Sequence, residues 1–481
     1  MVSFSCMVDH AREETWIVNI RNRLDEQFAD LTKLKPALAA LDTSKDKPSI
    51  YWTGSHPERF PVGILLLKSS GNVAEKDHMW EYVAFMTRWL GLDVTLFLRY
   101  MKEREDLVKS YYHYGGEDYQ RYFVFRESNA LQESLLIAGC FLATAILLLQ
   151  KVRNGAEILR GSRGNNSDPA DQRSLQFSIL YQRIMKDQIK TKIDMLRIRN
   201  QIPWFVVEAV FAHSSLSELF GGTRMDRLAM SCFDDLYPRV NKSKVKGGNL
   251  PSGGFKHLLH IFHWTRTPEE EGRWLVHTKP EQEQQPAKRF AEFYIPNAMN
   301  LLESATSFKR LDSSSIDVEY SNKRISALMQ LTPLHLFPYS NEIFHQLLNF
   351  EQRYPAYGLP VTAHFACMKS LLQTKADVKL LQKNGIVQNT MKGEEDVLSF
   401  LHDVGHFLVD EVRACIPDDL DSVSEKVIEH HERDVSIAYS EFKSQFCPNR
   451  WVIISVLAAI TLFVLTFIQT VYSALAYYKG S

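Results

Sequence analysis

An excess of charge of either sign is absent from this sequence. Its 56 lysines and arginines nearly balance 57 aspartates and glutamates, which leaves a formal net charge of −1. Nucleic-acid binding requires a basic surface that neutralises phosphates, commonly interleaved with aromatic side chains on which bases stack. The chain carries no such basic stripe, so we expect no nucleic-acid partner.

Closely spaced cysteines are also missing. The six cysteines are scattered, and no two form a Cys-x-x-Cys pair: Cys6, Cys140, Cys232, Cys367, Cys415 and Cys447. This pattern indicates reduced, mostly buried thiols rather than a disulfide framework or a zinc ribbon. The first 14 residues contain Asp9, Arg12 and Glu13 and no apolar run, so we expect no cleaved secretory signal.

The common catalytic and nucleotide-binding motifs are missing as well. The sequence has no Gly-x-x-x-x-Gly-Lys phosphate loop, no Gly-x-Gly-x-x-Gly dinucleotide fingerprint and no Gly-x-Ser-x-Gly nucleophile turn. We therefore predict no cofactor and no catalytic residue, and the sequence leans away from an enzyme.

One histidine pair superficially resembles a zinc-binding helix. His402 and His406 are four residues apart, a spacing that places both rings on one helical face. The zinc-protease motif needs a glutamate directly after the first histidine, and Asp403 stands there instead. We expect a structural or solvent-facing pair and predict no metal.

Two further histidine groups have ordinary explanations. His257, His260 and His263 recur every three residues among leucine, isoleucine and phenylalanine, which predicts a buried amphipathic helix. His430 and His431 lie among charged residues, which predicts a solvent-exposed face. The alternative is a membrane-tethered, metal-dependent enzyme that uses the first of these groups or the pair at 402 and 406.

The strongest physical signal is a long apolar run near the end of the chain. No charged residue occurs between Trp451 and Tyr478, and about 20 apolar residues suffice to cross the hydrocarbon of a bilayer as a helix. We predict a transmembrane helix over residues 451–472, followed by a short tail over 473–481. The predicted boundary residues of this anchor are Arg450, Trp451, Tyr472, Tyr478 and Lys479.

The position of this run suggests a tail anchor. Few residues follow it, so we expect the large domain to remain on the cytosolic side, with the plasma membrane as the membrane concerned. A second uncharged run, Leu135–Leu149, has only 15 residues. That length favours a helix buried in the core over a second span.

Helical periodicity dominates the rest of the chain. Apolar residues at three- and four-residue spacing include Trp16, Ile20 and Leu24 near the start, and Val397 to Val412 form the most regular amphipathic stretch. The predicted fold is mainly α: one large helical soluble domain over residues 16–446 with few short strands, a tail over 1–15, and the C-terminal transmembrane helix.

Two polar segments interrupt this pattern. Asn154–Arg173 is rich in glycine, asparagine and serine, and Thr267–Lys288 is crowded with Glu, Gln, Pro and Lys. We expect both to be surface loops that bury little, and loops of this kind commonly carry recognition.

Several segments, taken together and in order, resemble the plant family called "domain of unknown function 247". The similar segments are Trp16–Val18, Ser49–Tyr51, His78–Tyr82, Gly139–Phe141, Arg199–Glu208, Ala298–Lys309, Glu342–Gln352, Asp377–Val387 and the tail from Ile453 to Tyr472. The chain departs from the family pattern at Ala138 and Arg199, where the pattern has acidic residues, and at Trp52-Thr53, where it has Arg-Val.

The resemblance implies a single-pass plant membrane protein with a mainly helical domain, and it transfers no catalytic residue. Some grass members are implicated in pollen–stigma self-incompatibility, which implies a recognition role. We therefore expect a protein tethered to the lipid bilayer by its C-terminal helix that binds a protein partner in recognition or signalling.

Overall fold

The computed structural model describes most of the chain, and all structural statements refer to these residues. They are 15–25, 73–112, 129–149, 168–239, 241–242, 250–251, 253–268, 274–275, 289–312, 315–389, 393–411, 414–433, 437 and 450–479. The predicted tail over 1–15 lies almost wholly outside them, as does most of the predicted loop at 154–173.

Contacts divide the chain into two compact units. The first comprises residues 1–271, 313–316 and 337–354, and the second comprises residues 272–312, 317–336 and 355–481. The sequence predicted one domain over 16–446; that statement stays a prediction, and the units are described separately below.

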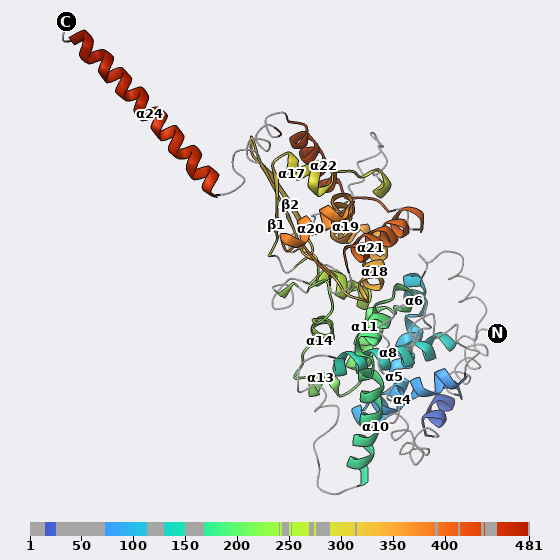
Figure 1. Cartoon of the computed structure of the whole chain (residues 1–481). Helices are drawn as coiled ribbons and strands as arrows, with labels where there is room; N and C mark the ends of the chain where they lie inside the picture. The colour runs from blue at the N-terminus through green and yellow to red at the C-terminus, as the bar shows by residue number, and fades with distance from the viewer. Residues whose placement is uncertain are drawn as a thin grey trace. The chain divides into compact units, whose positions relative to one another are not determined.

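All of the regular secondary structure in the described residues of the first unit is helical (Figure 1). After a helix at 15–25 come α4 (Val73–Leu90), α5 (Val94–Glu103), α6 (Glu105–Tyr112), α8 (Ala130–Leu149), α10 (Asp168–Met185), α11 (Gln188–Leu196), η3 (Ile198–Asn200), α12 (Trp204–Ala212), α13 (Leu216–Leu219), α14 (Met225–Cys232), α16 (Leu258–Trp264) and α18 (Ser340–Arg353). Although α18 comes much later in the chain, it packs against α11 and α16.

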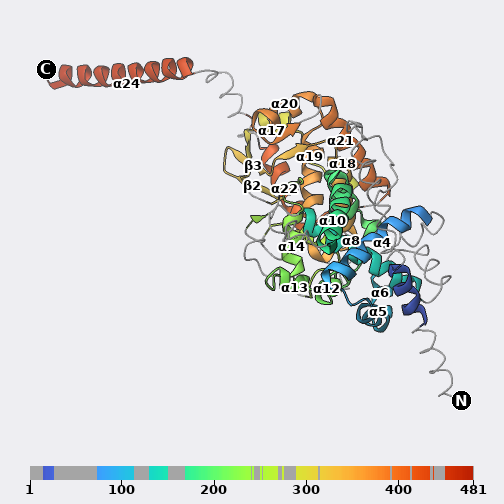
Figure 2. The same cartoon turned by 90° about the horizontal axis from the view of Figure 1, so that it is seen from below.

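Helix α8 is the centre of the first unit. It packs against α4, α5, α10, α12 and α14, and Figure 2 shows it among these helices. Leu131–Leu149 is long and apolar enough to cross a membrane, but 94% of it is buried. The predicted buried core helix is therefore confirmed.

The second unit contains all of the described strands. In its three-stranded sheet, β3 (Ala327–Leu331) lies between β1 (Thr306–Arg310) and β2 (Val318–Asn322). β1 pairs with β3 in parallel, and β2 pairs with β3 antiparallel. A separate parallel pair joins β4 (Leu334–Leu336) to β5 (Val387–Asn389).

Helices make up most of the second unit, and α22 packs on β2. They are η4 (Phe290–Glu292), α17 (Ala298–Glu303), η5 (Pro355–Tyr357), α19 (Pro360–Leu371), α20 (Lys375–Lys383), α21 (Glu394–His406), the π-helical turn η6 (Phe407–Glu411), α22 (Asp418–His431) and α24 (Arg450–Lys479). The predicted amphipathic stretch after Val397 thus forms α21 and runs into the π turn. The mainly helical class with few short strands is confirmed.

Helix α24 is a single continuous helix in both views (Figures 1 and 2). Its backbone runs over 30 residues, and the apolar stretch whose side chains are described without a break is Leu457–Ser473. By itself that stretch is shorter than a full span.

Candidate functional site

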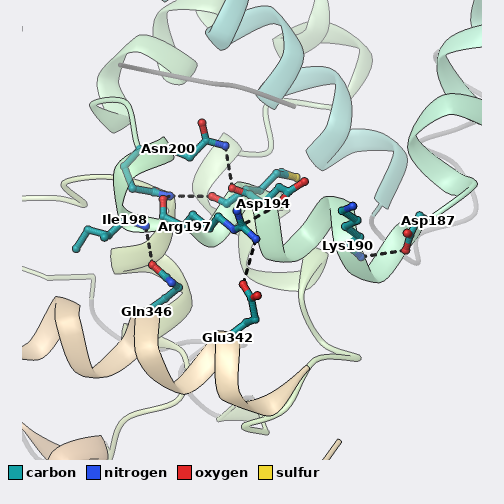
Figure 3. A network of polar contacts seen from close by, with 10 residues as sticks. Asp187, Lys190, Asp194, Arg197, Ile198, Asn200, Glu342 and Gln346 are labelled. Atoms are coloured by element: carbon teal, nitrogen blue, oxygen red, sulfur yellow. Dashed lines mark hydrogen bonds and ion pairs between the residues drawn. The ribbon is translucent and has the colours of Figure 1, made fainter. Parts of the chain in front are cut away.

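A polar network in the first unit joins two of the segments that carry the family resemblance (Figure 3). Arg197 follows α11, and its Nη2 lies 3.1 Å from Glu342 Oε2 on α18. Its Nε lies 3.5 Å from Asp194 Oδ1, and the Asp194 side chain is fully buried. One guanidinium is therefore shared between two carboxylates, which a charged, five-donor group does well.

Carboxamides satisfy the backbone around this arginine. The Ile198 N–H donates to Gln346 Oε1 at 2.9 Å, and Asn200 Nδ2 donates to the Asp194 carbonyl at 2.9 Å. Gln201 Nε2 donates to the carbonyls of Met195 and Arg197, both at 2.8 Å.

Gln201 also links the two neighbouring helices. Its Oε1 accepts the Leu259 N–H at 3.0 Å, near the start of α16. The end of α11 and the start of α16 each leave backbone groups without intrahelical partners, and this amide supplies them. The Asn-Gln-Ile-Pro segment of the resemblance thus has a structural explanation: its amides close a helix junction, and Pro203 is the N-cap residue of α12.

The three histidines of the His257–His263 segment are buried, as predicted, and they surround one ring. Their ring centroids lie 5.6, 5.4 and 4.8 Å from that of Phe350 on α18. His263 Nε2 lies 2.8 Å from the buried Glu351 Oε1. The remaining two rings accept backbone N–H groups, His257 from residue 260 and His260 from residue 256.

Burial strongly disfavours the charged form of His257 and His260. It lowers the pKa of His257 to about 3, helped by the nearby charges of Arg353 and Lys256. Burial also lowers the pKa of His260 well below its usual value, and the other two histidines and Lys256 add to the effect. His257 and His260 are therefore neutral packing elements near neutral pH.

The second histidine candidate lies on the surface. His402 and His406 are exposed on α21. No set of three His, Cys, Asp or Glu side chains able to hold a metal occurs in the part of the chain that the structure describes.

The expectation of a solvent-exposed face at His430 and His431 is wrong for His430, which is fully buried. His430 Nε2 lies 3.0 Å from the Ser304 carbonyl oxygen at the end of α17. His431 Nδ1 lies 3.1 Å from Ser304 Oγ. A helix end leaves its last carbonyls unsatisfied, and α22 supplies a ring nitrogen there. Because His430 has charged neighbours in the sequence, its burial against Ser304 could not be predicted from local composition.

The expectation that the segment 267–288 buries little is wrong at Trp274. This residue is 1% exposed, with φ at 62°. Its N–H donates to Asp419 Oδ2 at 2.9 Å, its indole N–H donates to Asp317 Oδ1 at 3.2 Å, and its carbonyl accepts the Leu359 N–H. A large aromatic residue inside an otherwise charged segment was the sequence feature that could have indicated burial at this position.

Two buried cations in the first unit also escaped the sequence reasoning. Lys192 is about 1% exposed and lies 2.5 Å from Asp235. Arg266 is fully buried, donates to the carbonyls of Pro238 and Phe233, and stacks on Phe262 at 3.9 Å. Burial lowers the pKa of Arg266 to about 9. Arg266 thus satisfies carbonyls at the end of α14 and in the loop that follows it. Nothing local in the sequence distinguishes these two cations from surface ones.

The predicted membrane-boundary residues lie on α24. Tyr472 is 70% exposed, while the side chains of Arg450, Trp451, Tyr478 and Lys479 lie outside the described residues. Every described side chain of α24 is exposed, including Phe463 and Phe467. The side chain of Arg199 also lies outside the described residues, and Ala138 is fully buried in α8.

Comparison with known proteins assigns this chain to a family. The model of DUF247, described as a plant protein of unknown function, matches residues 73–465. The UPF0481 protein At3g47200 of Arabidopsis thaliana is 21% identical over 294 residues, which is 59% of this chain and 60% of that protein. The chain thus spans less than two thirds of that relative's length. No solved structure gives a significant match. Because the family model covers most of the sequence, this chain belongs to the DUF247 family of plant proteins of unknown function.

Proposed function

We propose that α24 crosses a lipid bilayer and tethers the rest of the chain to it. The observation that carries this proposal is the helix surface itself. From Ile454 to Leu475 its described large apolar side chains are exposed on every side; for example, Leu462 is 65% and Phe463 is 74% exposed. A helix that is apolar all round is stable only when buried, and lipid is an environment that would bury it.

The polar groups of α24 are compatible with lipid. The hydroxyls of Thr461, Thr466 and Thr470 each donate to the carbonyl four residues earlier at 2.8 Å. A helix of 30 residues is about 45 Å long, which exceeds the roughly 30 Å of hydrocarbon. The proposed span is 451–472, with Arg450, Trp451, Tyr472, Tyr478 and Lys479 at its boundaries.

An alkaline carbonate wash tests the anchor. We expect the full-length protein to stay in the membrane pellet, and a version ending at Pro448 to be released into the supernatant. A shortened version that is retained as firmly as the full chain contradicts the proposal. A soluble-fraction readout before the wash confirms that the shortened protein is folded and present.

We further propose that the two units bind a protein partner in recognition or signalling. We favour this function over an enzyme because the described histidine cluster and the Arg197 network make internal contacts with other residues of the chain. The recognition role implied by the grass relatives of the family is the same kind of function. No observation in the described residues favours the metal-dependent alternative.

Affinity capture from detergent-solubilised membranes tests the interaction. The full-length protein serves as bait, and the matched control is α24 fused to an inert carrier, so that binding to the helix alone is subtracted. We expect a protein that is enriched only with the full chain. Equal recovery from both baits contradicts a role for the units.

We propose the cytosolic side of the plasma membrane as the location of the units. Three cysteines, Cys140, Cys232 and Cys367, are buried and make no disulfide. Such thiols fit a reducing compartment.

A further inference from the structure

Gln469 is a polar residue on α24 whose presence the proposed anchor alone does not explain. It is the one side-chain amide in the charge-free run of α24, and its side chain is exposed. No hydrogen bond or ion pair joins its carboxamide to any part of the chain that the structure describes. By contrast, Thr466 and Thr470 on either side of it have their hydroxyls satisfied within the helix.

We propose that α24 associates with α24 of a second copy of this chain, and that Gln469 hydrogen-bonds to its own counterpart. The inference rests on the proposed function, since it requires α24 to lie in lipid. Gln469 lies about 4.5 Å inside Tyr472 along the helix axis, and about 13 Å inside Tyr478. An amide that is left without a partner in lipid is costly, and interhelical hydrogen bonding relieves the cost.

The second copy is the occupant that the geometry favours. Two copies inserted in the same direction are parallel, so their Gln469 side chains lie at the same depth. A carboxamide has both donors and an acceptor, so two of them facing across a twofold axis satisfy each other reciprocally. A polar side chain at one core position also fixes the register of paired parallel helices.

The neighbours of Gln469 on the helix fit such a pair. Positions seven apart lie within about 20° of one another on a helix, which places Leu462 on the face of Gln469. Ala458 and Ser473 lie on the same side and are small enough for close approach of two backbones. Phe467 is about 160° away, on the opposite face.

Cysteine cross-linking in native membranes tests the face. Leu462→Cys and Phe467→Cys form a matched pair, because the two wild-type side chains are 65% and 64% exposed and α24 contains no cysteine of its own. On mild oxidation of the full-length protein, we expect a disulfide-linked dimer several-fold above the wild-type baseline from Leu462→Cys and none above it from Phe467→Cys. Equal yields from the two faces, or an adduct with a different protein, overturn the proposal.

Substitution at Gln469 then tests the amide. In the Leu462→Cys background, we expect Gln469→Leu to lower the dimer yield by about threefold to tenfold and Gln469→Asn to retain it. Thr461→Val is the control, since its hydroxyl already bonds the Leu457 carbonyl; it should leave the yield unchanged. An undiminished dimer with Gln469→Leu overturns the inference.

The carbonate wash on the same samples separates the two proposals. Retention in the pellet without face-selective cross-linking overturns the self-association and leaves the anchor intact. Release of the full-length protein overturns both. Retention with cross-linking that depends on Gln469 supports both.

Discussion

At the scale of single residues, Arg197 holds together parts of the chain that are distant in sequence. Its partner Glu342 is 145 positions away, and its other partner, Asp194, is fully buried. Removing a cation from two partly or fully buried carboxylates leaves their charges uncompensated, which costs far more than losing a surface pair.

We expect Arg197→Ala to lower the free energy of unfolding by about 2–4 kcal/mol. Chemical denaturation of the full-length protein in detergent measures this. Lys375→Ala is the matched control, because its ion pair with Glu395 is exposed; its unfolding midpoint should not move. Similar losses for the two variants would show that the Arg197 network contributes no more than a surface pair.

At the scale of elements, Gly139 sets the distance between α8 and α12. A Cβ added to it would lie 2.9 Å from Val210 Cγ2 and 3.4 Å from Val206 Cγ1. The Gly-Cys-Phe segment of the family resemblance thus has a physical reason, since only a glycine leaves room for the two valines. Both helices belong to the buried centre of the first unit.

We expect Gly139→Ala to destabilise the protein by about 1–3 kcal/mol through overpacking. The added methyl group meets Val210, so the Gly139→Ala/Val210→Ala double variant should be more stable than the sum of the two single changes predicts. A double-mutant cycle by denaturant unfolding measures this coupling. Strict additivity would place the strain of Gly139→Ala somewhere other than the contact with Val210.

His257, the residue at the start of α16, makes the first unit sensitive to acid. The unfolded pKa of histidine is about 6.5, and burial lowers that of folded His257 to about 3. The unfolded state therefore binds more protons between these values, and stability is present above about pH 6.5 and is lost as the pH falls toward 3.

From pH 7 to pH 5, His257 alone should cost about 2 kcal/mol of stability. His257→Asn keeps an acceptor at the start of α16, where His257 accepts the N–H of His260, and it does not titrate. Between pH 7 and pH 5, the free energy of unfolding of this variant should fall by about 2 kcal/mol less than that of the wild type. An identical pH dependence in the variant and the wild type would contradict a neutral, buried His257.

At the scale of the whole molecule, the proposed anchor and cytosolic orientation make a prediction about accessibility. On intact, sealed microsomes whose cytosolic face is outside, added protease should digest the two units and leave only a short fragment that contains α24. The measurement is an immunoblot with tags at both ends, with a lumenal marker as the control. Protection of the units until detergent is added would place them on the lumenal side.

The helical class, the buried run at Leu135–Leu149 and the buried helix at His257–His263 could all be predicted from the sequence. Each depends on periodicity or apolar length over neighbouring residues, and such local patterns survive in any packing that buries an apolar face. The same reasoning identified the family segments but gave no reason for the residues in them.

What the sequence did not reveal are contacts between distant segments. His430 lies among charged neighbours, yet α22 turns it toward Ser304, 126 residues earlier. Trp274 stands in a charged segment, yet Asp317 and Asp419 hold it in place. Local composition reports the average environment of a segment, while the burial of one side chain depends on which other element covers it.

The sequence by itself therefore determined the helical class, the family and the apolar character of the last helix, because these follow from residue type and spacing along the chain. Only the tertiary structure decided which polar groups are buried and satisfied. Arg197, the three histidines around Phe350 and His430 owe their surroundings to groups brought in from far along the chain, and no local pattern specifies that pairing.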